Sequence, residues 1–173
     1  ITYLAIGLIK TRLRDTYGDA PSYRVKGEPV SLPDAQALAE QDKYQFQWWA
    51  LDLVGARPAP GDEKKGADKG IDGRLFFHEE TGGSTKQIVF SVKAGHLLAT
   101  HVRDLRGVLE REGADIAVLI TVEEPTKLMR QEAASAGFYE AKYSAPGAKN
   151  QKHPRLQILT VAELLAGKRV DCP

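Results

Sequence analysis

Apolar positions along the chain follow helical and strand spacings in turn, and this pattern predicts an α/β domain. Residues 34–55 start with Asp34, which we expect to be an N-cap, and continue with strong helix formers. We expect Trp48 and Trp49 to be core residues rather than base-stacking residues. The segment predicts a long helix or a kinked pair, because apolar residues recur at helical spacing at Phe46, Trp49, Ala50 and Leu53.

The middle of the chain predicts a hairpin, a helix and a buried strand. Segments 71–78 and 87–93 flank a glycine-containing turn, which predicts an antiparallel hairpin. The uninterrupted apolar run 116–121 is typical of a central strand buried on both faces. The helix between them has one apolar face, formed by Val102, Leu105, Val108 and Leu109.

The last third continues the alternation of helix and strand. A helix is expected after Thr126, and a short strand at 156–159. Thr160 and Glu163 have the spacing of a capping box that opens a final helix. The whole order predicts a mixed central sheet of about four to five strands flanked by helices.

Composition limits the classes of function. The chain has 173 residues, 42% of them hydrophobic, and 24 Lys and Arg against 23 Asp and Glu, so a site for a polyanion has to be a local patch. Cys172 is the single cysteine, which excludes an internal disulfide and a multi-cysteine zinc site and fits a reducing cytoplasm. No stretch approaches the roughly 18 apolar residues of a membrane span. We therefore expect a cytoplasmic protein without a membrane segment.

The first residues suggest a division of the chain. The apolar stretch 1–9 is followed by Lys10, Arg12 and Arg14, the reverse of the order in a secretory signal. We expect residues 1–33 to be an N-terminal helix and connector from a larger parent protein, and residues 34–173 to be the main domain.

The residues best suited to chemistry are Asp72 and Lys93. They lie at the start of one predicted hairpin strand and at the end of the other, so they can converge at one edge of the sheet. A carboxylate there can bind a divalent cation, and a lysine can stabilise charge on a phosphate. Such a pair is also common by chance. Asp68, four residues before Asp72, is expected to fix the loop through hydrogen bonds to the backbone.

The segments 66–73 (GADKGIDG) and 89–93 (VFSVK) resemble the motif of the PD-(D/E)xK nucleases, and within them the Mrr-type restriction endonucleases. The resemblance covers roughly residues 43–138. It implies a restriction-endonuclease-like fold and metal-dependent hydrolysis of double-stranded DNA in a restriction-modification context. The implied cofactor is Mg²⁺ or Mn²⁺.

Carried over residue by residue, the resemblance makes Asp72 the metal-binding aspartate and Lys93 the catalytic lysine. The backbone carbonyl of Val92 would complete the metal site. Ser91 stands where the motif usually has Glu, Asp or Gln, and Gln47 stands where many relatives have a helix glutamate. The alternative to an active endonuclease is therefore a catalytically weak or inactive DNA-binding or docking module attached to a DNA methyltransferase.

A second resemblance is to the C-terminal extension of some bacterial DNA methyltransferases. Segments 8–14, 123–127 and 158–165 carry it. It implies a methyltransferase domain in the same parent chain.

Basic residues suggest where DNA would bind. The interval 141–155 contains cations and no acid, so it is either a solvated surface loop or a phosphate-contacting patch. A nearby helix could extend this patch, although ordinary helix ion pairs are the alternative reading. His96 and His101 are expected to be solvated. The candidate DNA-binding residues are Lys142, Lys149, Lys152 and Arg155 of the interval, and Arg103 and Arg106 of the helix.

Overall fold

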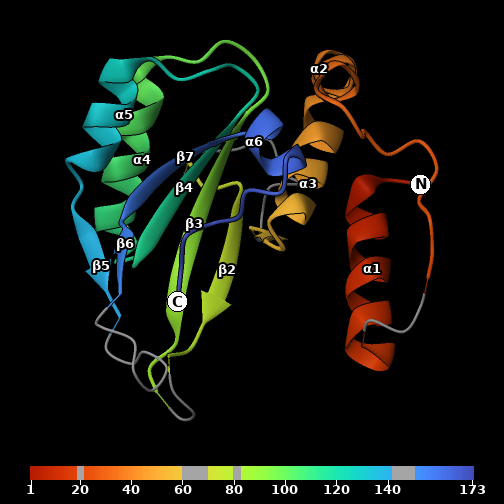
Figure 1. Cartoon of the computed structure of the whole chain (residues 1–173), viewed down its shortest axis with the longest axis horizontal. Coiled ribbons are helices and arrows are strands. Elements are labelled where there is room, and N and C mark those ends of the chain that lie inside the picture. The colour runs from red at the N-terminus through yellow and green to blue at the C-terminus, as the bar shows by residue number, and fades with distance from the viewer. Residues whose placement is uncertain (19–21, 60–69, 80–82, 142–150) are drawn as a thin grey trace.

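A computed structural model describes residues 1–18, 22–59, 70–79, 83–141 and 151–173 of the chain (Figure 1). The helices in this part of the chain are α1 (Tyr3–Tyr17), α2 (Leu32–Gln41), α3 (Lys43–Leu53), α4 (Ala99–Arg111), α5 (Lys127–Ala134) and α6 (Val161–Leu165). The strands are β1 (Arg57–Pro58), β2 (Gly73–Phe77), β3 (Lys86–Lys93), β4 (Ile116–Thr121), β5 (Phe138–Glu140), β6 (Lys152–Pro154) and β7 (Leu156–Thr160). The predicted α/β class is confirmed.

The main sheet has five strands in the order β1-β2-β3-β4-β7. The predicted hairpin is β2 and β3, which pair antiparallel with Gly73 opposite Phe90. The connections after β3 are parallel, since β3 pairs with β4 and β4 with β7 in that direction. The sheet is therefore mixed, as the pattern of elements predicted.

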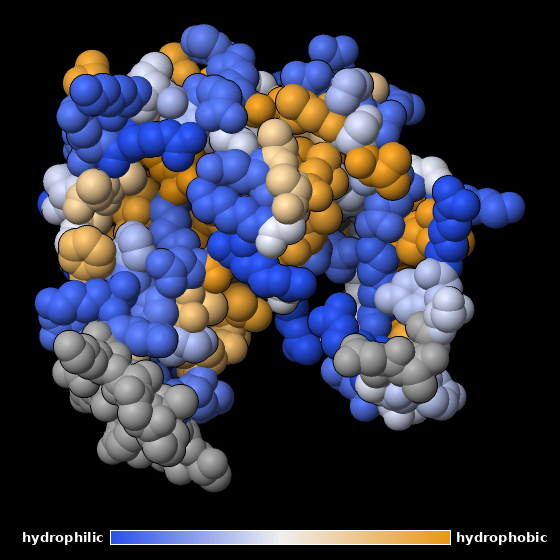
Figure 2. All heavy atoms as spheres, in the orientation of Figure 1, coloured by the Kyte–Doolittle hydropathy of each residue, from blue (hydrophilic) through white to orange (hydrophobic). Residues whose placement is uncertain are grey.

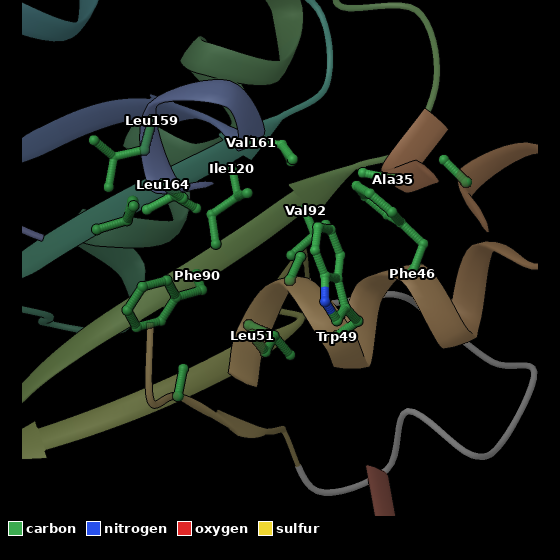
Figure 3. Close-up of a cluster of buried hydrophobic side chains, with 14 of the residues drawn as sticks. Ala35, Phe46, Trp49, Leu51, Phe90, Val92, Ile120, Leu159, Val161 and Leu164 are labelled. Carbon is green, nitrogen blue, oxygen red and sulfur yellow. The ribbon is translucent and has the colours of Figure 1, made fainter. Parts of the chain in front are cut away.

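Helices cover both faces of this sheet, because successive side chains of a strand point to opposite sides. On one face, Phe90 and Val92 of β3 pack with Trp49 of α3 and with residues of α2 and α6 (Figure 3). On the other face, Val89 packs with Leu105 and other apolar residues of α4 and α5. All six residues of β4 are buried, which confirms the predicted central strand.

The helical segment after residue 30 is a pair of helices with a break at Asp42. The Asp42 side chain accepts hydrogen bonds from the N–H groups of Tyr44 and Gln45 and so begins α3. The N-cap of α2 is Ser31 rather than Asp34, and that prediction was wrong. Asp34 occupies the third helical position and completes a capping box with Ser31. Trp49 is fully buried, and Trp48 is partly buried.

Two further local predictions can be compared with the fold. The capping box of Thr160 and Glu163 is confirmed by reciprocal hydrogen bonds of 2.9 and 3.1 Å. The interval 141–155 is not wholly a surface loop, because β6 forms a separate two-stranded sheet with β5 and buries His153. No local pattern marks this strand, and only its pairing with β5 defines it.

The N-terminal helix α1 lies against α3 through polar contacts. Lys10 Nζ lies 2.7 Å from Asp52 and 2.6 Å from Glu28, and the N–H of Tyr3 donates to the side chain of Gln45. Burial alone would lower the pKa of Lys10, but its hydrogen bonds with the two carboxylates raise it. Among the described residues, no helix has both the length and the apolar character needed to cross a membrane.

Candidate functional site

Asp72 lies directly before β2 and is held on both sides. Its N–H donates to the carbonyl of Phe90 on β3 at 2.8 Å, and its carbonyl accepts the N–H of Ala59 at 3.1 Å. Its carboxylate accepts the backbone N–H of Val92 at 2.5 Å. The Asp72 carboxylate therefore accepts the hydrogen bond that the N–H of Val92, near the end of β3, would otherwise donate to the backbone of a neighbouring strand.

The carbonyl of Val92 points to the side of β3 on which Asp72 lies. In a β-strand, the N–H and C=O of one residue point to the same side, and here the N–H points to Asp72. The side chain of Val92 instead enters the hydrophobic cluster on the α3 face (Figure 3). The two groups named for metal binding are thus neighbours at one edge of β3, and metal binding by them stays a prediction.

Ser91 and Lys93 project from β3 toward α4. Because they alternate with Val92, they share the face opposite the α3 cluster. They line a cleft of about 570 Å³, which we call the α4 cleft. Ser91 is only 4% exposed, whereas Lys93 is half-buried. The α4 cleft is completed by Gly70 and by residues of α4, namely His101, Arg103, Asp104, Leu105, Gly107, Val108 and Arg111.

The described lining of the α4 cleft carries more positive than negative charge. Its lining includes the cations Lys93, Arg103 and Arg111 and one carboxylate, Asp104. Arg111 is paired with Glu112 at 3.2 Å. Lys93 and Arg103 form no ion pair with any residue that the structure describes. Within the described part of the chain, two cations without an ion-pair partner therefore face a concave surface, an arrangement suited to phosphate oxygens.

His101 lies in the first turn of α4, lines this cleft and is half-buried, so it is only partly solvated. Its Nδ1 accepts the N–H of Leu98 at 3.2 Å, which caps the helix. Burial lowers the pKa of His101, and the nearby Lys93 ammonium lowers it further. The imidazole is therefore neutral at pH 7 and adds no charge to the cleft. His96, in contrast, is exposed and lies 3.2 Å from Glu123.

Gln47, the third motif position, belongs to α3. This helix packs on the face of the sheet opposite the α4 cleft, and Gln47 is partly buried there. It is not among the residues that line the cleft. A role for Gln47 beside Asp72 and Lys93 stays a prediction.

The other basic candidates are engaged with neighbouring elements. Arg106 donates to Ser135, the residue that follows α5, at 2.9 Å and lies 4.0 Å from Glu132 of α5, so these partners are not on its own helix. Lys152 pairs with Glu140 at 2.6 Å. Arg155 pairs with Glu110 at 3.1 Å. Lys142, Lys149 and Asp68 lie outside the described residues.

The oxygen donors of the motif around Asp72 bear on whether a hard divalent cation can bind there. Mg²⁺ prefers octahedral oxygen coordination with carboxylate ligands. No group of three or more His, Cys, Asp or Glu side chains able to hold a metal occurs in the described part of the chain. Here the motif supplies one carboxylate, Asp72, which already accepts a backbone N–H. Among the described residues, the motif therefore offers fewer carboxylates than a hard divalent cation prefers, and the Mg²⁺ or Mn²⁺ cofactor stays a prediction.

Sequence reasoning missed part of the cleft. Asp104 and Arg111 were not named as site residues, although both follow His101 at helical spacing and so can lie on one face of α4. That spacing could have identified them. The His153–Asp171 pair, with 2.6 Å between Nδ1 and Oδ1, had no local signal because the two residues meet only in the folded chain.

The fold and the motif positions define a restriction-endonuclease-like domain, with a hairpin carrying Asp72 and Lys93 next to a parallel strand pair. The model of the family NACHT-associated inactive Restriction Endonuclease 1 matches residues 43–166. The chain belongs to this family. No curated protein matches the chain. No solved structure matches it either.

Proposed function

We propose that this chain is a catalytically inactive restriction-endonuclease-like module that binds double-stranded DNA through phosphate contacts in the α4 cleft. The observation that carries the proposal is that Lys93 and Arg103 face the cleft and pair with no carboxylate of the described residues, while the neutral Ser91 stands at the acidic position of the motif.

The loss of catalysis follows from the oxygen groups around β3. Hydrolysis in this fold depends on a cation held by carboxylates, which activates water and neutralises developing charge. Ser91 offers only a neutral hydroxyl that is almost fully buried. Asp72 retains its carboxylate but uses it to hold the Val92 N–H. The description of the matched family as inactive agrees with this reading.

Retention of binding is supported by the contrast between free and paired cations. Arg106, Lys152 and Arg155 each lie within 4.0 Å of a carboxylate from a neighbouring element. Lys93 and Arg103 do not, among the described residues, and they share one concave surface. Contacts to phosphate depend on charge and position and need no catalytic machinery.

The partner protein follows from the family's description, which associates these domains with NACHT. We propose that the module serves such a partner. A methyltransferase domain in the same parent chain, suggested by the sequence, is the alternative.

The test is fluorescence anisotropy with a labelled 20-base-pair duplex over a series of salt concentrations. Lys93→Ala and Arg103→Ala should each reduce the slope of log affinity against log salt by about 0.9 if one phosphate contact is lost. Arg106→Ala is the matched control. It removes a cation from the same helix, but one whose side chain contacts Ser135 instead of the cleft.

Cleavage is measured in parallel on plasmid DNA with Mg²⁺ and with Mn²⁺. We expect no nicking by the wild-type chain. Nicking that is lost in Asp72→Ala would refute the inactive assignment. Binding that is insensitive to salt, or equally reduced in the Arg106→Ala control, would refute the α4 cleft as the DNA site.

A further inference from the structure

A second cleft of about 590 Å³ lies between α1 and the outer edge of the main sheet, away from β3. Figure 2 shows a notch between α1 and the rest of the molecule, bordered by hydrophilic residues. We call this cleft the α1 groove. It is lined by residues of α1, by the end of α3, and by β1 and β2.

The floor of the α1 groove contains an unpaired strand edge. β1 has two residues and pairs with only Gly73 and Arg74 of β2. Backbone groups of alternate strand residues point to the same side. The carbonyl of Asp72 accepts the N–H of Ala59, and Arg74 lies opposite Arg57 in the pairing of β1 with β2. By this alternation, the N–H and C=O of Phe76 also point away from β3, toward the outer edge of the sheet. No described strand lies opposite Phe76, so its backbone groups are available to an added strand.

The walls of the groove carry excess positive charge. Arg12 and Arg14 of α1 and Arg57 of β1 are exposed and form no ion pair with a described residue. Two other charged lining residues are already compensated, because Asp52 pairs with Lys10 and Arg74 with Glu112. Asp15 is the remaining carboxylate of the lining. Three guanidinium groups against one carboxylate favour an acidic occupant.

The groove also has apolar surface at two places. Phe76 is 56% exposed and Leu8 is 52% exposed, and both line the groove. An added strand presents alternate side chains to opposite sides. Phe76 alternates with Leu75 and Phe77, which pack in the α3-side cluster, so its side chain lies on the opposite face of β2 from α1. An added strand could therefore direct apolar side chains to Phe76 on one face and acidic side chains to Arg12 and Arg14 of α1 on the other.

We propose that the α1 groove binds an extended acidic peptide segment of a partner protein, which adds as a strand to the Phe76 edge of β2. Strand addition obtains affinity from main-chain hydrogen bonds and specificity from alternate side chains. This site is independent of the proposed DNA-binding function, because β3 and α4 do not contribute to it.

Two other occupants fit less well. A nucleic acid would match the arginines but leave the backbone groups of Phe76 and the exposed apolar surface without complementary partners. A second copy of the chain would bring the three arginines of each copy together, and like charges at an interface disfavour association.

The probe is a fluorescein-labelled, end-blocked eight-residue peptide of alternating Glu and Val, and the full chain is titrated into it. We expect saturable binding, and at least tenfold weaker binding of the same peptide with Lys in place of Glu. In NMR hydrogen exchange, the Phe76 amide should become protected when the Glu-Val peptide is bound. No saturation up to about 1 mM protein, or equal binding of the Lys peptide, would overturn the proposal.

Two kinds of variant test the edge and the charge separately. Phe76→Pro removes one outward N–H without removing a hydrogen bond to β3, and should weaken binding about fivefold or more relative to Phe76→Ala. Arg57→Ala should weaken binding about twofold to fivefold, whereas Arg169→Ala, exposed on the C-terminal segment, should not. If Phe76→Pro does not fold, the amide protection in the wild-type chain decides the same point.

Two further outcomes would show that the α1 groove binds something other than an acidic peptide. Displacement of the peptide by a 12-nucleotide single-stranded DNA that also shifts the Phe76 amide would overturn the proposal in favour of nucleic acid. Concentration-dependent dimerisation that Arg57→Ala enhances would overturn it in favour of a second copy. Duplex DNA binding through the α4 cleft should be unchanged in Phe76→Ala, so the two proposals succeed or fail separately.

Discussion

The carboxylate of Asp72 accepts the backbone N–H of Val92 at 2.5 Å, and this contact joins the start of β2 to the end of β3. Val92 is buried on the α3 face, so its N–H has little access to water. The contact gives Asp72 a structural role whether or not it takes part in chemistry, because an unpaired buried N–H is costly.

The first prediction follows from this contact. Asp72→Ala leaves the Val92 N–H without its acceptor and should lower the free energy of unfolding by about 1–3 kcal/mol. Asp72→Asn keeps an oxygen acceptor at the same place and should lose less. Urea denaturation of the three proteins measures the difference. Equal stability of the alanine and asparagine variants would show that the hydrogen bond contributes little.

The second prediction concerns Gly73. A Cβ atom at this position would lie 2.5 Å from Leu51 of α3 and 3.1 Å from the carbonyl of Arg57. Gly73→Ala should therefore displace α3 or β1 and cost about 1–3 kcal/mol of stability, as overpacking does. Gly95→Ala is the control, since a Cβ there meets nothing within 4 Å. A melting temperature of Gly73→Ala equal to that of the control would contradict the close packing.

The third prediction restores the missing acid of the motif. Ser91→Glu supplies a second carboxylate at the edge of the α4 cleft, next to Asp72 in the hairpin, and hard cations gain most from anionic oxygen ligands. We expect Mn²⁺ binding by calorimetry to tighten by about tenfold or more relative to Ser91→Gln, a difference of about 1.4 kcal/mol. If the two variants bind Mn²⁺ equally, Asp72 and residue 91 do not form one metal site.

The fourth prediction separates the two basic regions. Lys152 and Arg155 are already paired with Glu140 and Glu110, so their double alanine variant should change the salt slope of DNA binding less than the Lys93 and Arg103 double variant. The latter should reduce the slope by about 1.8, which corresponds to two phosphate contacts at about 0.9 each. The opposite order would move the DNA site to the 141–155 interval.

The fifth prediction concerns the pH dependence of His101. Burial and the Lys93 ammonium lower the pKa of His101 below its ordinary value of 6.5. The unfolded chain therefore takes up a proton at His101 at a higher pH than the folded protein. His101 contributes stability above about pH 6.5, and this stability is lost as the pH falls toward the folded pKa.

The measurement is an NMR titration of the His101 imidazole. Lys93→Met removes the neighbouring charge and should raise the pKa of His101 toward its ordinary value, although burial will keep it lowered. Lys127→Met, on α5 and exposed, should leave it unchanged. Identical titration curves for wild type and Lys93→Met would show that Lys93 does not act on His101.

Much of the fold could be predicted because its signals are local. The hairpin of β2 and β3, the buried strand β4 and the capping box of Thr160 and Glu163 each depend on residues a few positions apart or on one short run. Alternation along β3 also determines that Ser91 and Lys93 share a face, whatever packs against it.

Tertiary structure decided which residues meet across longer separations. Arg103 and Arg106 are three residues apart on one helix, yet Arg103 faces the α4 cleft and Arg106 faces Ser135, because α5 packs on that side of α4. Likewise, β6 exists only through its pairing with β5. Spacing along the sequence determines which side of an element a residue occupies, whereas the neighbour on that side is selected by the packing of elements far apart in the chain. The sequence alone therefore determined the elements and the motif, and only the tertiary structure decided which of the described cations form ion pairs with neighbouring elements.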